Sequence, residues 1–180
     1  MIILEMLLLF CITSCKEEEP VSLIPDIYSG TATALKNSEE WSGFTRSQKL
    51  KTNRISIIVN TFSSQGFLRE TLGIGSVKPY FERQNIKSID GNGFTETSAG
   101  YGTWIDDGDV GGDSYGLDTT VHDSFIHITS YNPNNAEIEG IFKVSLILER
   151  EGNQTPGKAP EKLVFTEGTF TVKVDPEWFE

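Results

Sequence analysis

The chain has 180 residues, and its 15 Lys and Arg stand against 26 Asp and Glu, so the formal net charge is −11. This length suits one domain with a sizeable core. The acidic balance argues against a nucleic-acid-binding protein, because such proteins present a basic patch to the phosphate backbone. Aromatic residues make up 11% of the chain and supply core material, which argues against a disordered protein.

The N-terminal residues predict where in the cell the protein is located. Residues 6–12 form an apolar run that is too short to span a bilayer, which needs about 20 apolar residues. The run has the length of the apolar region of a signal peptide. It ends in Ile12-Thr13-Ser14-Cys15, which resembles the lipobox of bacterial lipoproteins. That resemblance implies a signal peptide over residues 1–14, cleavage before Cys15, and lipidation of Cys15.

Cys15 is followed by Lys16-Glu17-Glu18-Glu19 and a proline. The run has two interpretations. It is a solvated spacer, or it is an export signal similar to the acidic signal after the lipidated Cys of surface lipoproteins in Bacteroidetes-type bacteria. We favour the export signal, which implies a lipid-anchored, surface-exposed protein of the bacterial outer membrane. Residues 15–29 are then the lipidated Cys and a flexible tether, and the mature chain has no second Cys for a disulfide.

From residue 30 onward the apolar residues alternate with a period of two, which is typical of β-strands. The expected strands cover residues 30–36, 41–45, 55–59, 68–74, 80–89, 100–105, 115–121, 125–131, 137–149 and 163–174. In the last of them the apolar phase changes between Phe165 and Phe170, which predicts a β-bulge at Glu167-Gly168. We expect residues 30–180 to form a single antiparallel β-sandwich with a short C-terminal tail. A closed or partly open β-barrel is the alternative.

Four stretches of the chain carry a family resemblance. They are residues 66–72, 106–115, 128–142 and 167–172. Together they resemble uncharacterised lipoproteins of Bacteroidetes-type bacteria, which share a domain of unknown function. The shared motifs are strand and turn residues, so the resemblance implies a fold and an address, and it implies no catalytic residue.

The sequence offers no catalytic constellation that we can identify. Its two histidines, His122 and His127, are five positions apart, so on a strand they point to opposite faces. No pair of carboxylates stands out for glycoside hydrolysis in so acidic a chain. We therefore expect no catalytic residue and favour a non-enzymatic protein.

One acidic stretch is a candidate metal site. It contains three glycines and four carboxylates within eight residues, and the carboxylates are those of Asp106, Asp107, Asp109 and Asp113. Carboxylate oxygens are the ligands that Ca²⁺ prefers, although the spacing is not that of an EF-hand loop. The alternative, which we favour, is a solvated acidic turn. We therefore expect no cofactor, and Ca²⁺ is the candidate if the stretch binds an ion.

The aromatic residues Tyr101, Trp104 and Tyr115 are candidate ligand contacts, because their rings offer flat faces to a sugar or a peptide. Core packing is the alternative and is favoured. The sequence as a whole predicts a lipid-anchored envelope protein that is a surface binding or accessory module, with a glycan or a protein as its ligand and no nucleic-acid partner. The alternatives are a polymer-acting hydrolase with a carboxylate pair and a structural component of an envelope complex.

Overall fold

The structure is a computed structural model, and it describes residues 24–50, 53–87, 96–152 and 158–178. The predicted signal peptide, the lipidation site Cys15 and the export signal at residues 16–19 lie outside the described residues. Within them, the chain forms ten strands and one short 3₁₀ helix. These are β1 (Gly30–Lys36), β2 (Glu39–Lys49), β3 (Ile55–Phe62), β4 (Leu68–Val77), β5 (Arg83–Asn85), β6 (Ser98–Ile105), β7 (Val110–Leu117), β8 (Phe125–Asn132), β9 (Glu137–Arg150), β10 (Lys162–Lys173) and η1 (Pro176–Trp178).

Eight of these strands close into an antiparallel barrel in the order β10-β1-β2-β3-β4-β6-β7-β9, because β9 also pairs with β10. The all-β prediction is confirmed, and so is the closed barrel that was its alternative. The sandwich, its main form, is wrong in part. The strands are antiparallel as expected, but β10 is bonded along one edge to β1 and along the other to β9, so the sheet closes on itself instead of forming two separate sheets.

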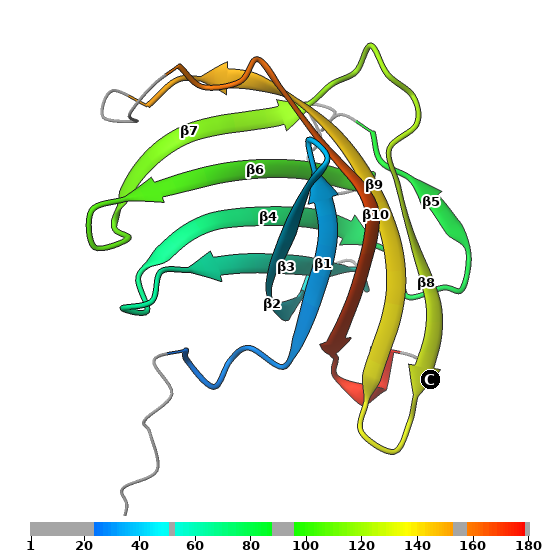
Figure 1. Cartoon of the computed structure of the whole chain (residues 1–180). Helices are drawn as coiled ribbons and strands as arrows, with labels where there is room; N and C mark the ends of the chain where they lie inside the picture. The colour runs from blue at the N-terminus through cyan, green and yellow to red at the C-terminus, as the bar shows by residue number, and fades with distance from the viewer. Residues whose placement is uncertain (1–23, 51–52, 88–95, 153–157, 179–180) are drawn as a thin grey trace, which may run out of the picture.

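The barrel is strongly bent. Figure 1 shows β3, β4, β6 and β7 crossing β1, β9 and β10 at a steep angle. The long strand β9 joins two neighbours on one edge, since its first half pairs with β8 and its second half with β7. β8 in turn carries β5. The side chain of Gln84 in β5 bonds both the N–H and the carbonyl of Lys78, at 2.8 Å each, and so ties this extension back to the end of β4.

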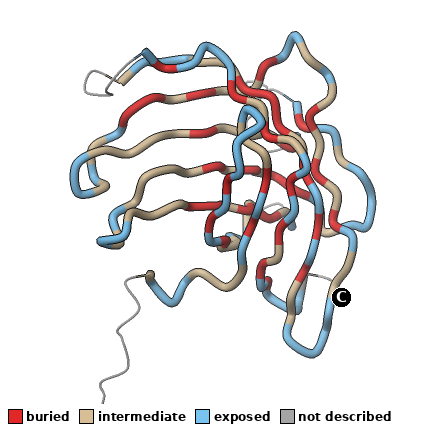
Figure 2. Tube along the Cα trace, in the orientation of Figure 1, coloured by how far each residue is buried: buried red, intermediate tan, exposed pale blue. Residues whose placement is uncertain are grey.

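The core lies inside the barrel, where alternate residues of each strand are buried, as Figure 2 shows. The largest fully buried side chains are Phe165, Ile55, Ile57, Leu72, Ile74, Ile126, Ile128, Ile138, Leu146, Val59, Val77 and Val144. The predicted bulge is confirmed, because the register between β9 and β10 shifts between Phe165 and Gly168. Glu167 occupies the left-handed region there, with a φ of 53°, and the extra residue lets Phe165 and Phe170 both face inward.

At one end of the barrel, which we call the hairpin end, β1, β3, β6 and β9 end and β2, β4, β7 and β10 begin, because successive barrel strands are antiparallel. The turn between β6 and β7 lies against the start of β4 there. A Cβ added at Gly108, in the β6–β7 turn, would lie 2.8 Å from the backbone nitrogen of Leu68 at the start of β4. The sequence candidates for metal and ligand binding lie at or near this end.

Candidate functional site at the hairpin end of the barrel

The four predicted metal ligands divide into two groups. Asp106, Asp107 and Asp109 are exposed in the turn between β6 and β7. Asp113 is buried on β7, and its Oδ1 accepts a hydrogen bond from the backbone N–H of Gly152 at 2.8 Å. The predicted quartet is therefore split between the turn and the barrel wall.

Within the turn, a hydrogen bond to Asp107 and the charge of Asp107 raise the pKa of the Asp109 carboxyl, so the two groups lie close together. In the described parts of the chain, no group of three or more His, Cys, Asp or Glu side chains is placed to hold a metal ion. Ca²⁺ binding stays a prediction, and melting with Ca²⁺ and with a chelator at constant ionic strength would test it.

The three predicted ligand-contact rings also divide. Tyr101 and Tyr115 face the barrel interior, where they are 5% and 3% exposed, and their ring centroids lie 5.7 Å apart in an edge-to-face arrangement. Trp104 is half-buried on the outer face, where its indole N–H donates to Thr71 Oγ1 at 3.1 Å. Two of the three rings therefore belong to the interior at the hairpin end.

A polar cluster that the sequence analysis missed lies beside Tyr101. The carboxylate of Glu70 on β4 accepts hydrogen bonds from the ammonium group of Lys36 on β1 and from the indole N–H of Trp41 on β2. The Lys36 ammonium also lies 3.4 Å from the Tyr101 hydroxyl. The Lys36 and Glu70 side chains remain 23% and 20% exposed, so solvent reaches this cluster.

The local strand geometry explains why these residues meet. Lys36 and Trp41 follow the inward alternation of their strands, and the small residue Ala34 stands directly opposite Trp41. The pairing of β2 with β3 starts only at Phe44, so the first residues of β2 pair with β1 alone. Strands β2 and β3 are therefore unpaired before Phe44, and the side chains of Lys36 and Trp41 reach Glu70 of β4 across this opening.

Burial and nearby negative charge keep the phenol groups of Tyr101 and of its neighbour Tyr115 neutral. Burial is the main cause of the raised pKa of Tyr101, and the charge and hydrogen bond of Glu70 raise it further. Burial also raises the pKa of Tyr115, with Asp113 as the next cause. Neutral phenols act as hydrogen-bond donors, and the Tyr115 hydroxyl donates to the carbonyl of Pro160 at 3.0 Å.

One signal in the sequence could have revealed Glu70. It stands at an inward position between Leu68 and Leu72, on the face that otherwise holds apolar residues. A charged side chain in such a position needs a partner inside the fold. Its partner Lys36 has no comparable signal, because a lysine at the end of a strand is ordinary.

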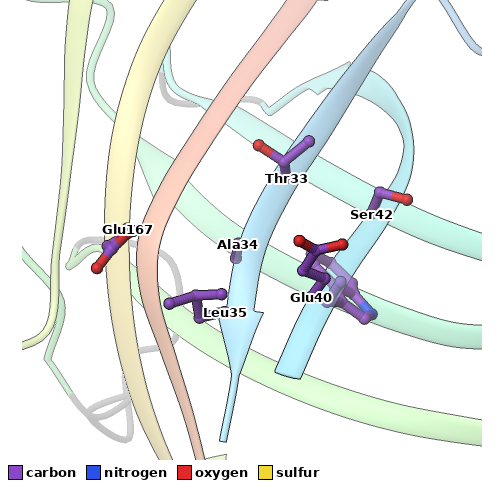
Figure 3. A pocket seen from close by; sticks show the side chains of 7 residues that line it. Thr33, Ala34, Leu35, Glu40, Ser42 and Glu167 are labelled. Carbon is purple, nitrogen blue, oxygen red and sulfur yellow. The ribbon is translucent and has the colours of Figure 1, made fainter. Parts of the chain in front are cut away.

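Of two hollows in the surface, the first is lined by one residue of the cluster, Trp41, and the second by none. The first, of about 500 Å³, is lined by Thr33, Ala34, Leu35, Glu40, Trp41, Ser42 and Glu167. Figure 3 shows that Leu35 of β1 lies between the carboxylates of Glu40 and Glu167, so these two do not form a facing pair. The second, of about 410 Å³, lies between the start of β7 and the end of β9 and includes the side chain of Arg150.

The two histidines do not meet. His127 lies on β8 opposite Arg83 of β5, and His122 is exposed in the connection between β7 and β8. Within the described ranges, neither belongs to a group of side chains that could hold a metal ion.

The comparisons with known proteins found no match: no family model fits the chain, and no curated protein and no solved structure is significantly similar to it. The resemblance to lipoproteins therefore stays a prediction. Among the residues that the structure describes, no helix has the length and the apolar composition needed to cross a membrane.

Proposed function

We propose that this protein is a lipid-anchored envelope protein whose barrel is a non-enzymatic binding module for a small polar ligand. The observation that carries the proposal is the polar cluster around Glu70, which is partly open to solvent at one end of a barrel whose core is formed mainly by apolar side chains. An interior formed by eight strands is either filled by side chains or holds one small ligand.

The composition of the cluster favours an uncharged, hydroxyl-bearing ligand such as a glycan unit. Ligand sites combine apolar and aromatic walls with a few polar groups that fix orientation. Here the rings of Trp41 and Tyr101 lie beside the charged pair, and both pack against Phe165. Lys36 supplies donors and Glu70 supplies acceptors, and because their charges balance, a ligand with a net charge gains no Coulomb attraction from the pair.

Trp41 provides the test, because its indole contacts Glu70 directly. In a background where Trp104 and Trp178 are replaced by Phe, the indole emission reports on this site alone. Titration with mono- and oligosaccharides should shift the emission in a saturable way. Glu70→Gln should abolish the shift. Glu82 is an exposed glutamate just before β5, away from the cluster, and Glu82→Gln should leave the shift unchanged. Equal binding by the Glu70→Gln variant would place the ligand elsewhere.

The lipid anchor has its own test, since it rests on the sequence around Cys15. Mass spectrometry of the mature N-terminus should show a chain that begins at an acylated Cys15. The Cys15→Ala variant should leave the membrane fraction, because several acyl chains contribute roughly 0.8 kcal/mol per buried methylene and the variant has none. An unmodified chain that begins at Met1 would refute the anchor.

The cluster supports binding over the alternative of hydrolysis. A hydrolase of polymers would need one free carboxyl as acid and a second as base or nucleophile. The carboxylate of Glu70 is held by Lys36 and Trp41, and that of Asp113 by the backbone of Gly152. The carboxylates of Glu70 and Asp113 are therefore both engaged as acceptors.

A further inference from the structure

An aromatic patch covers part of the outer face of the barrel. It consists of Ile27, Tyr28, Phe44, Phe62 and Phe67. Three of its members are exposed large hydrophobic residues: Ile27 at 63%, Phe44 at 38% and Phe67 at 40%.

Three rings of the patch are in contact with one another. The centroid of Tyr28 lies 5.3 Å from that of Phe62 and 6.5 Å from that of Phe44, and the centroids of Phe44 and Phe62 lie 6.2 Å apart. Phe67 closes the turn that follows Phe62, because its carbonyl accepts a hydrogen bond from the backbone N–H of Ser63 at 2.8 Å. Exposed apolar residues that gather in one place, unlike single ones, mark interaction sites.

The chain enters the barrel across this patch. Asn60 Nδ2 donates to the Tyr28 hydroxyl at 2.8 Å, and the backbone N–H of Ser29 donates to the carbonyl of Thr45 at 2.9 Å. Figure 1 shows the N-terminal segment leaving the barrel on the side of the turn between β3 and β4. Only twelve positions separate Cys15 from Ile27, and such a length spans about 40 Å at full extension.

We infer that the aromatic patch rests on the lipid surface to which Cys15 is attached. The inference rests on the proposed lipid anchor. The anchor holds the barrel within one short chain length of the bilayer, and the patch is the part of the barrel that this chain reaches first. Tyr is enriched at the membrane–water interface, and Arg can keep its charged head there while its stem covers apolar surface. The patch contains Tyr28, and the guanidinium of Arg69 lies 5.8 Å from the ring centroid of Phe67.

The charge of the protein decides how the contact can form. The net charge is −11, and the acidic turn Asp106–Asp109 packs against the start of β4 next to the patch. The lipid headgroups therefore offer this region no net Coulomb attraction, and contact depends on the insertion of the rings. Vesicles of zwitterionic phospholipid are the probe that isolates this contribution.

Site-specific quenching tests the inference, and the chain is well suited to it. Once residues 1–14 are removed and Cys15 is acylated, the mature protein has no free thiol, so an added Cys is the only labelling site. Phe67→Cys and Tyr80→Cys each receive a fluorophore. Tyr80 is the matched control, because it is an exposed aromatic residue, at 58%, beyond the far end of β4.

The labelled, acylated proteins are placed in vesicles of zwitterionic phospholipid that carry a nitroxide quencher on the lipid. The label at position 67 should be quenched several-fold more strongly than the label at position 80. In an Ile27→Ser, Phe44→Ser variant that keeps its melting temperature, quenching at position 67 should fall towards that at position 80. Equal quenching at both positions in the acylated parent protein would overturn the inference.

Two controls separate this inference from other outcomes. Mass spectrometry of each sample shows whether Cys15 is acylated, so failure of the anchor is distinguished from failure of the patch to touch lipid. Gel filtration in detergent shows the oligomeric state. A dimer that is lost in the Ile27→Ser, Phe44→Ser variant, together with unquenched label at position 67, would make the patch a contact between two copies and would overturn the lipid assignment.

Discussion

Asn37 and Ser38 make up the whole turn between β1 and β2, and both have positive φ, at 50° and 71°. A two-residue hairpin loop with this geometry is a type I′ turn, which favours Asn followed by Gly. Asn37 meets that preference and also bonds Val164 and Lys162 of β10. Ser38 does not meet it, because its Cβ is strained in the left-handed region.

Ser38→Gly should therefore raise the free energy of unfolding by about 1 kcal/mol, which urea denaturation would measure. Ser42→Gly is the matched control. It lies within strand β2, where glycine costs conformational entropy, so that change should destabilise the protein. A Ser38→Gly variant less stable than the parent would show that the turn is not held in this conformation.

The fold stabilises the charged form of the Asp118 carboxyl. The hydrogen bond from Lys162 is the main cause that lowers the pKa of its carboxyl to about 2, and the hydrogen bond from Thr120 is the second cause. A carboxyl with a lowered folded pKa stabilises the protein above its unfolded pKa of 3.8. That contribution is lost as the pH falls from 3.8 to about 2.

Urea midpoints measured at pH 5, 3.5 and 2.5 would test this dependence. In the Asp118→Asn variant the drop in stability over this window should be smaller than in the parent, because the variant has already lost the contribution. The exposed Asp26 provides the control, and Asp26→Asn should keep the slope of the parent. Parallel slopes for Asp118→Asn and the parent would contradict the assignment.

At the scale of elements, Glu70 of β4 joins β1 and β2 through Lys36 and Trp41, and the contributions of Lys36 and Glu70 to stability should be strongly coupled. Glu70→Leu removes the acceptor of two donors, the half-buried ammonium of Lys36 and the buried indole N–H of Trp41. The expected cost is about 2–3 kcal/mol of unfolding free energy. The double variant Lys36→Met, Glu70→Leu should recover part of that loss, because it no longer leaves an unpaired charge. Additive losses in a double-mutant cycle would show that the pair is not coupled.

The elements themselves could be predicted where alternation was strong. Strand β1 has the predicted bounds, Gly30–Lys36, and the change of apolar phase located the bulge at Glu167. The strand expected over residues 80–89 was largely wrong, since only Arg83–Asn85 is a strand in the described part, which ends at residue 87. There Gln84 bonds the backbone of Lys78 through its side chain, and Tyr80 and Phe81 are exposed. The alternation of apolar residues does not reveal that a side chain, here Gln84, takes the place of a neighbouring strand in bonding the backbone.

The closure of the barrel is a property of the whole molecule, and the local patterns in the sequence could not reveal it. It depends on the pairing of β1 with β10, in which Ala32 stands opposite Phe170. Strands of a sandwich and of a barrel share the same alternation, so only this distant pairing separates the two folds. The same distance hid the polar cluster, because Lys36, Trp41 and Glu70 come from three strands and meet only where β2 and β3 part.

Display on the cell surface is also a property of the whole molecule, and it provides the last prediction. The acidic run Lys16-Glu17-Glu18-Glu19 comes directly after the proposed lipidation site. If it is an export signal, replacing the three glutamates by Ala should leave acylation and membrane attachment intact. The barrel should then be protected from protease added to intact cells, because the protein is retained on the inner side of the outer membrane.

The matched control changes the net charge equally but elsewhere. Glu39, Glu40 and Glu161 are exposed on the barrel, and their replacement by Ala also removes three negative charges. Because these residues are remote in sequence from Cys15, that variant should remain accessible to protease. Accessibility of both triple variants would make the run a spacer. Loss of accessibility in both would mean that total charge, and not the position of the run after Cys15, governs display.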